Sequence, residues 1–156
     1  DGRPFGVMLL GPAGCDDRIT EIAALLQPPL RMAVVGAHLT GQPLNHQLRA
    51  LGAHLVETTR TAPVYRLFAL DTQPAKPGLV RVPEGGAAIE AELWELSPAA
   101  LGHFTAALPR PMTLGSVELA DGASAPGFLC EPQAVATARD ITSHGGWRAY
   151  LSASRP

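Results

Sequence analysis

The chain has 156 residues, of which 46% are hydrophobic, and this length and composition suit one folded domain and exclude a disordered chain. The formal net charge is −2, and the basic residues are scattered, whereas nucleic-acid-binding domains usually carry a basic stripe. No apolar run approaches the roughly 20 residues that a membrane-spanning helix needs. We therefore expect neither a nucleic acid nor a membrane as partner.

The first residues show no initiator Met and no basic segment followed by an apolar core, so they do not resemble a secretory signal. We expect a fragment or a processed chain. Cys15 and Cys130 are far apart and form no Cys-x-x-Cys pair. This usage favours two buried free thiols and a reducing, cytoplasmic setting.

The N-terminal 29 residues predict a strand, a turn and a helix. The strand is expected at 5–10 and the helix roughly at 16–27, with one apolar face made by Ile19, Ile22, Ala23 and Leu26. Pro28-Pro29 ends the helix and forms a stiff boundary. This unit holds too few elements to cover its own strand, so we expect it to need a partner, either another domain or a second copy in a homodimer.

The rest of the chain predicts many short strands and few helices. Strands are expected at 31–35, 54–59, 65–70, 79–82 and 89–96, with a helix at 43–51 that Gly52 ends. Ser97 should cap a second helix, a hairpin should join 116–119 to 127–130 across Asp121-Gly122, and a short helix should occupy 143–151. This pattern favours an α/β (α+β) fold in which a small mixed sheet curls towards a barrel.

The segment after the 31–35 strand is the strongest candidate for a binding site. A strand that breaks into the run Gly36-Ala37-His38-Leu39-Thr40-Gly41 and then enters a helix directs backbone N–H groups at one spot, which suits carboxylate or phosphate. His38 lies inside this loop and can exchange a proton near neutral pH. The alternative is a histidine that only hydrogen-bonds the loop backbone.

Other catalytic motifs are missing from the sequence. There is no Gly-x-Gly-x-x-Gly pattern, no Gly-Lys-Ser/Thr loop and no Gly-x-Ser-x-Gly elbow. The histidines show no metal-ligand spacing, so we expect no metal site and no cofactor. Lys76, the single lysine, is expected in an exposed loop because prolines flank it at 74 and 77.

Two strands carry further candidate side chains. Glu90, Glu92 and Trp94 share one face of the 89–96 strand, which is either solvated or, in a curled sheet, lines a cavity where a glutamate fixes the His38 tautomer or binds a substrate N–H. Tyr65 either offers its hydroxyl to the pocket or is an ordinary half-buried tyrosine. Arg66 and Arg110 are open candidates for pairing with a carboxylate.

Several ordered motifs carry a family resemblance. The runs MAVVGAHLTGQPLNHQL, TTRTAPVYRLFAL, KPGLVRVPEGGAAIEAELWEL, GFLCEP and DITSHGGWRAYL resemble the C-terminal domain of allophanate hydrolases over residues 31–151. Residues 1–29 resemble the last strand and helix of an amidase-signature domain plus a linker, and the resemblance assigns residues 30–156 to the C-terminal domain. In that family the amidase domain comes immediately before this one, so the resemblance implies an amidase domain in cis.

The resemblance also implies a function in urea or triazine nitrogen assimilation. The amidase half deaminates allophanate, and the C-terminal domain is thought to break down the resulting N-carboxycarbamate, a small anionic substrate, with loss of CO₂. His38 is our candidate for the general acid that protonates the nitrogen. We expect substrate contacts from Gly36, Ala37, Leu39, Asn45, Tyr65 and Glu90.

The domain also resembles the γ-glutamylcyclotransferase fold, in which a glycine loop holds a substrate carboxylate. Cyclotransferases carry a catalytic glutamate after the helix that follows the central strand, whereas this sequence has Ala107-Leu108-Pro109-Arg110-Pro111 there. Three functions therefore stay open: decarboxylation through His38, cyclotransferase chemistry, and a non-catalytic module that dimerises or docks the amidase.

Overall fold

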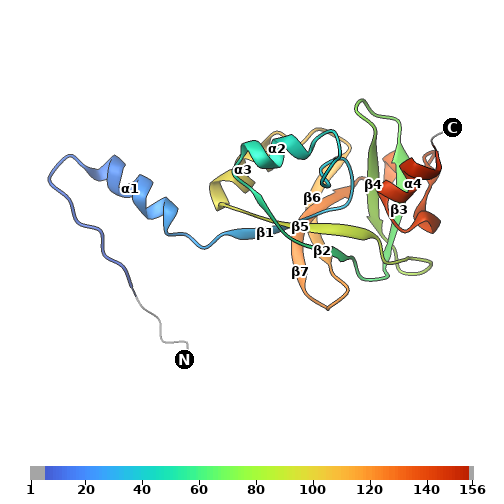
Figure 1. Cartoon of the computed structure of the whole chain (residues 1–156), viewed down its shortest axis with the longest axis horizontal. Coiled ribbons are helices and arrows are strands. Elements are labelled where there is room, and N and C mark those ends of the chain that lie inside the picture. Colours follow the sequence, from blue (N-terminus) through green and yellow to red (C-terminus); the bar gives the residue numbers. More distant parts are fainter. Residues whose placement is uncertain (1–5, 155–156) are drawn as a thin grey trace.

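The structure, a computed structural model, describes residues 6–154 and builds them around a five-stranded sheet with the strand order β2-β5-β1-β7-β6 (Figure 1). Its strands are β1 (Leu30–Val34), β2 (His54–Arg60), β5 (Glu90–Leu96), β6 (Met112–Glu118) and β7 (Ser124–Cys130). The central strand β1 pairs antiparallel with β5 and parallel with β7. The predicted mixed sheet is thus confirmed.

The two outer strands of this sheet meet at one end. Just beyond β2 and β6, Thr61 forms a bridge with Leu119. The N–H of Ala62 donates to the Glu118 carbonyl, and the N–H of Ala120 donates to the Arg60 carbonyl, each at 2.9 Å. These bonds satisfy backbone groups that an open sheet leaves unpaired, and they curl the sheet towards a barrel, as predicted.

A three-stranded sheet, ordered β4-β3-β8, packs beside the first one. It consists of β3 (Tyr65–Leu70), β4 (Lys76–Arg81) and the two-residue β8 (Arg139–Asp140). Five short helical segments complete this part of the chain: α2 (Asn45–Ala50), α3 (Pro98–Ala106), the 3₁₀ turns η1 (Pro132–Val135) and η2 (Thr142–His144), and α4 (Trp147–Ala153). Ser97 caps α3 by accepting the Ala100 N–H, as expected from the Ser-Pro pair.

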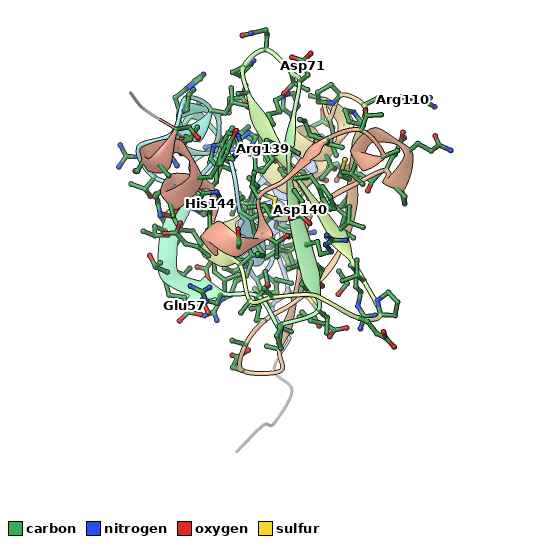
Figure 2. The ribbon with its side chains drawn as sticks, turned by 90° about the vertical axis from the view of Figure 1, so that its right-hand side faces the viewer. Glu57, Asp71, Arg110, Arg139, Asp140 and His144 are labelled. Atoms are coloured by element: carbon green, nitrogen blue, oxygen red, sulfur yellow. The ribbon has the colours of Figure 1, made fainter. Side chains whose placement is uncertain are left out.

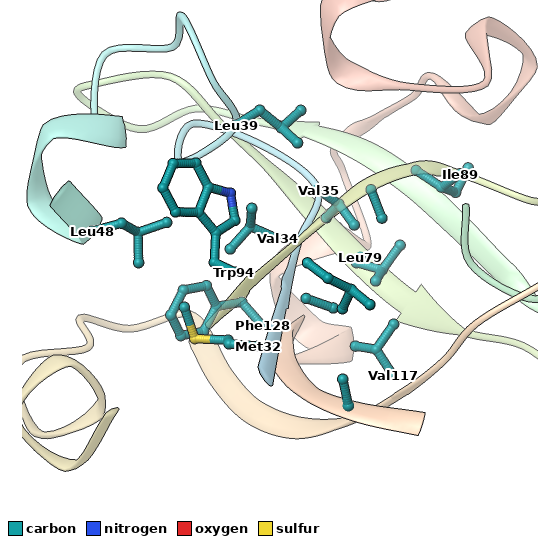
Figure 3. Close-up of a cluster of buried hydrophobic side chains, with 14 of the residues drawn as sticks. Met32, Val34, Val35, Leu39, Leu48, Leu79, Ile89, Trp94, Val117 and Phe128 are labelled. Carbon is teal, nitrogen blue, oxygen red and sulfur yellow. The ribbon is translucent and has the colours of Figure 1, made fainter. Parts of the chain in front are cut away.

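The core lies between the sheets and under the segment that follows β1 (Figure 3). Leu39 and Leu48 pack with Trp94 at one end of it, and Val34 and Phe128 lie close by. The buried Leu39 side chain therefore ties the loop after β1 to the protein interior. This anchoring holds the neighbouring loop residues in one conformation.

The N-terminal segment departs from the prediction. Residues 6–10 form no strand, and Phe5 lies outside the described residues. Helix α1 (Asp16–Leu25) is present, but it stands apart from the sheets (Figure 1). Its expected buried face is exposed, with Ile22 and Leu26 42% and 56% accessible. A strand needs a partner for its backbone groups and an apolar helix face needs a covering surface, and residues 30–154 supply neither.

The second departure concerns β5. The expectation that Glu92 and Trp94 form a solvated face is wrong, because both side chains are buried. The loop after β1 and helix α4 cover this face, as the hydrogen bonds of Glu92 to Thr40 and Arg148 show. The predicted last helix is also interrupted: Gly145 and Gly146 separate η2 from α4.

Candidate functional site

In the loop between β1 and α2, the turn at 36–38 has all three of its carbonyl groups hydrogen-bonded within the protein. The Leu39 N–H donates to the Gly36 carbonyl, and the Leu44 N–H donates to the Ala37 carbonyl, both at 2.9 Å. The side-chain amide of Asn45 donates to the His38 carbonyl at 2.8 Å. These three bonds fix the peptide planes of residues 36–38.

The amide N–H groups of Gly36, Ala37 and His38 have no hydrogen-bond acceptor among the described loop and side-chain contacts. The same three residues line a cavity of about 480 Å³. Successive backbone N–H groups of this kind form a concavity that binds anions. Three amide N–H groups, at residues 36–38, thus have no acceptor among these contacts, whereas the N–H of Leu39 is used inside the turn.

His38 lies in the wall of this cavity, held on one side by a hydrogen bond and on the other by aromatic rings. Its Nε2 and Oε1 of Gln47 are 2.9 Å apart. The ring meets Phe104 edge-on at a centroid distance of 5.0 Å, and Phe128 lies 5.7 Å away. With Oε1 as the acceptor, the proton of the neutral ring sits on Nε2, and Nδ1 is left for a ligand.

Burial lowers the pKa of His38 below its ordinary value, because the charged ring is poorly solvated there. The hydrogen bond to Gln47 acts in the opposite direction, while the positive charge of Lys76 and the neighbouring His46 lower the pKa further. The free ring is therefore mainly neutral at neutral pH. A bound anion would favour the charged form and allow the ring to take up a proton.

The remainder of the cavity is largely apolar. Phe104, Leu108, Met112 and Phe128 make up part of its wall, from α3, the segment after it, and the hairpin β6–β7. Among the lining residues that the structure describes, Lys76 is the one with a formal charge, and no aspartate or glutamate is present. This charge distribution suits an anion.

Lys76 and Gln47 are the functional side chains that sequence reasoning missed. The expectation that Lys76 lies in an exposed loop is wrong: it is the first residue of β4, half-buried, and lines the cavity. Proline-rich flanks are typical of loops, but here Pro77 is inside the strand, opposite Ala69 of β3. The position of Gln47 beside the His38 loop follows from helical geometry only once it is known that α2 begins at Asn45.

Two of the predicted binding residues support the loop and are not part of the cavity wall. Leu39 is buried in the core, and its N–H is bonded within the turn. Asn45 is buried, and its side-chain amide donates a hydrogen bond to the His38 carbonyl. Both hold the loop in shape, since neither belongs to the described lining of the cavity.

The structure does not bring the other candidates to the His38 cavity. Tyr65 is fully buried, and its hydroxyl oxygen accepts the Glu118 N–H. Glu90 pairs with Arg148 and faces a separate hollow beside β2 and η2. Neither Glu90 nor Glu92 fixes the His38 ring, because Gln47 occupies that position.

The two candidate arginines also lie elsewhere. Arg66 forms an ion pair with Asp140 of β8, on the side of the molecule where His144 and Arg139 are found (Figure 2). Arg110 is exposed in the turn before β6. Neither is among the residues that line the cavity.

The lowered pKa of His38 predicts how stability depends on pH. The unfolded chain, with a histidine pKa of about 6.5, binds a proton more readily than the folded chain does. The free energy of unfolding is therefore highest above the pKa of the unfolded histidine, where the ring is neutral in both states. It decreases as the pH falls through the lower pKa of His38 in the folded state. Wild-type protein should lose more melting temperature between pH 7.5 and pH 5 than His38→Gln does. Equal losses in a calorimetric comparison would contradict this assignment.

Similarity to known proteins identifies the family of this chain. Residues 30–152 match the family model of the allophanate hydrolase C-terminal domain. The chain belongs to this family. The urea amidolyase of Saccharomyces cerevisiae is 42% identical over 128 residues, which is 78% of this chain and 7% of the yeast protein.

Solved structures agree with this membership. Kluyveromyces lactis allophanate hydrolase superposes on 81% of this allophanate hydrolase C-terminal domain and 22% of its own length, with a TM-score of 0.78 and 37% identity. A uropathogenic E. coli-specific protein matches 83% of this chain over 100% of its own length, with a TM-score of 0.75 and 31% identity. An aig2-like protein from mouse, 18% identical with a TM-score of 0.53, shares the fold alone. The expected α/β (α+β) fold class, a small mixed sheet with a few short helices, is confirmed.

Two further observations concern residues 6–154, the part of the chain that the structure describes. Within that range, no helix is long and apolar enough to cross a membrane. The same residues contain no group of three or more His, Cys, Asp or Glu side chains arranged to hold a metal ion.

Proposed function

We propose that this domain takes the N-carboxycarbamate produced by an amidase domain in cis and releases CO₂ from it, in the degradation of urea in the cytoplasm. The observation that supports the proposal is that residues 36–38, whose amide N–H groups have no described acceptor, line one cavity that includes the His38 imidazole. The family membership supports this substrate class. The chain spans 7% of the yeast urea amidolyase, so the whole enzyme's reaction is inferred for this domain and its companion together.

In the proposed reaction, one carboxylate of the substrate binds the 36–38 amides and lies near Lys76. Arrival of a doubly charged anion raises the pKa of His38, so the ring becomes imidazolium. The C–N bond to the second carboxylate then breaks, and its electron pair passes to the nitrogen, which takes the proton from His38. The products are CO₂, carbamate and the neutral ring.

The apolar wall fits this chemistry. The departing carboxylate loses its charge and becomes CO₂, which is apolar, so weak solvation beside Phe104 and Phe128 favours the product side of the step. The remaining carboxylate keeps its charge and needs the polar end of the cavity. A cavity with one polar end and one apolar end therefore serves both halves of the substrate.

A cyclotransferase reaction has less support. The segment after α3, where cyclotransferases carry their glutamate, contributes Ala107, Leu108 and Pro109 to the cavity wall. No carboxylate occurs among the described lining residues, so the cavity lacks a base of that kind. Incubation with γ-glutamyl amino acids should give no 5-oxoproline, and its detection would reverse this preference.

Malonate, a stable dicarboxylate of similar size, tests the binding half of the proposal. Wild-type protein should bind it, and Lys76→Met should weaken binding roughly three- to tenfold, because one nearby positive charge is lost. The same substitution should raise the pKa of His38, since Lys76 is among the charges that lower it. Calorimetry and histidine NMR titration measure the two effects.

A matched control for Lys76→Met is Arg31→Met. Arg31 is an exposed cation of β1 that lies near Glu95 and is absent from the cavity wall. Removing it changes the net charge equally, yet it should leave malonate affinity unchanged. An equal loss in both variants would assign the effect to overall charge and would count against the site.

We further propose that the N-terminal segment contacts the amidase domain. Val7, Met8 and Leu10 are 60–85% accessible, and the apolar face of α1 is open as well. Such contiguous exposed apolar residues are typical of surfaces that another domain covers. The resemblance of residues 1–29 to the end of an amidase domain supports that partner over a second copy of this chain.

Removing residues 1–29 tests this assignment. The melting temperature of 30–156 should stay within a few degrees of the full chain, because α1 stands apart from the sheets and its apolar face is exposed. Light scattering and pull-down with the separate amidase domain should show binding by the full chain and none by the shortened one. A large drop in melting temperature, or equal binding, would contradict the assignment.

A further inference from the structure

A buried charged group lies directly behind the site loop. Glu92 of β5 is 1% exposed, and its Oε2 accepts hydrogen bonds from the Thr40 N–H at 2.8 Å and the Trp94 indole N–H at 3.0 Å. The Thr40 hydroxyl donates to the same oxygen at 3.1 Å. Thr40 is two residues after His38, so the Glu92 carboxylate is hydrogen-bonded to the loop just beyond the histidine.

Arg148 of α4 completes the group from the other end of the chain. It donates to Glu90 Oε1 at 2.7 Å, to the Thr40 carbonyl at 2.9 Å, and to Glu92 Oε1. The peptide groups on both sides of Thr40 are thus held, the N–H by Glu92 and the carbonyl by Arg148. One guanidinium and one carboxylate therefore tie the loop to both β5 and the C-terminal helix.

The two glycines before α4 allow the segment that carries Arg148 to pack closely against Glu90 of β5. A Cβ at Gly146 would lie 2.7 Å from the Glu90 Cβ, too close for any side chain. The Gly145 carbonyl accepts the Glu90 N–H at 2.9 Å, which brings the two segments together. The Gly-Gly-Trp-Arg run thus places Arg148 against β5, while Trp147 anchors the helix in the core.

The network of Glu92 and Arg148 costs more free energy of folding than apolar packing in the same place would. Burying a carboxylate is unfavourable, and replacing a buried ion pair by apolar side chains is often neutral or stabilising. Burial alone would raise the pKa of Glu92, but the hydrogen bonds from Arg148, Thr40 and Trp94 outweigh it and keep the group ionised. All of the loop contacts of this pair converge on Thr40, which points to a role in setting the loop conformation.

We propose that Glu92 and Arg148 are positioning residues, which hold Thr40 and thereby fix the turn at 36–38 that presents its amides and the His38 ring to the cavity. The inference rests on the proposed function for its catalytic meaning, but its geometry is independent of the substrate. Without the pair, the loop would sample other conformations and the amides would no longer converge. Misplacement of about 1 Å can cost about a hundredfold in rate.

The experiment compares Glu92→Gln, Arg148→Lys and Thr40→Val with wild type. Glu92→Gln keeps the shape but loses one acceptor oxygen, and Arg148→Lys cannot reach three acceptors together. Thr40→Val removes one hydroxyl bond, and Thr40→Ser should restore it. Asp140→Asn is the matched control, because it removes the charge of the Arg66–Asp140 ion pair, neither member of which lines the cavity or bonds Thr40.

The readouts are malonate affinity, the NMR titration of His38, and hydrogen exchange of the 36–38 amides. Glu92→Gln and Arg148→Lys should weaken malonate about tenfold, shift the His38 titration and speed exchange, while Asp140→Asn should change none of these. A lowered melting temperature with unchanged affinity, titration and exchange would overturn the inference. If Glu92→Gln does not fold, the Thr40→Val and Thr40→Ser pair decides by the same readouts.

Failure of the proposed function gives a different result. Wild-type protein that binds no malonate and releases no CO₂ would remove the substrate assignment. The His38 titration and the amide exchange then still decide the inference, because a change in both with Glu92→Gln supports positioning of the loop and no change refutes it.

Discussion

Replacing His38 by alanine is expected to lower the rate of CO₂ release by about 10²–10⁴-fold, the usual contribution of a positioned proton donor. The reason is local: the His38 ring is held by Gln47 at Nε2, lies in the cavity wall, and belongs to the same turn as the 36–38 amides. The measurement supplies allophanate and a separate amidase and follows CO₂. Malonate affinity should fall much less than the rate, because the amides and Lys76 remain.

Two further variants sharpen this test. His54→Ala removes an exposed histidine of β2 that contacts Glu95, outside the cavity, and should leave the rate unchanged. Gln47→Leu should lower the rate less than His38→Ala does, since it removes the support of the ring and not the ring itself. An undiminished rate with His38→Ala would rule out proton donation by this residue.

Local signals predicted much of the fold. The strand at 65–70 has the predicted bounds, and Ser97-Pro98 begins a helix as expected, because alternating apolar residues and a capping hydroxyl act within a few residues. The loop at 36–41 was predicted for the same reason: a glycine that follows a strand marks a turn wherever the chain runs next.

Features that depend on distant contacts were harder to predict. Glu92 alternates with apolar residues as a solvated carboxylate does, and its burial depends on Arg148, which is 56 residues away. Lys76 looks like a loop residue until the pairing of β4 with β3 is known. The exposed face of α1 has the pattern of a buried helix, because the pattern records a contact and not the partner that makes it.

Replacing Gly36 by alanine is expected to destroy anion binding. A Cβ at this position would lie 2.4 and 2.5 Å from the Cγ and Cδ of Pro77, which is buried in β4 and rigid. Either the loop or the strand must move, and each movement displaces part of the site: the first shifts the 36–38 amides, the second shifts Lys76. Malonate affinity should fall more than tenfold, and overpacking should cost about 1–3 kcal/mol of stability.

Gly102→Ala is the matched control for this steric argument. Gly102 lies exposed within α3, and an added Cβ meets no atom within 4 Å. Stability should rise by roughly 0.5–1 kcal/mol, as for alanine in place of glycine inside a helix, with malonate affinity unchanged. If Gly36→Ala bound malonate as tightly as wild type, a loop set close against Pro77 would not be required for binding.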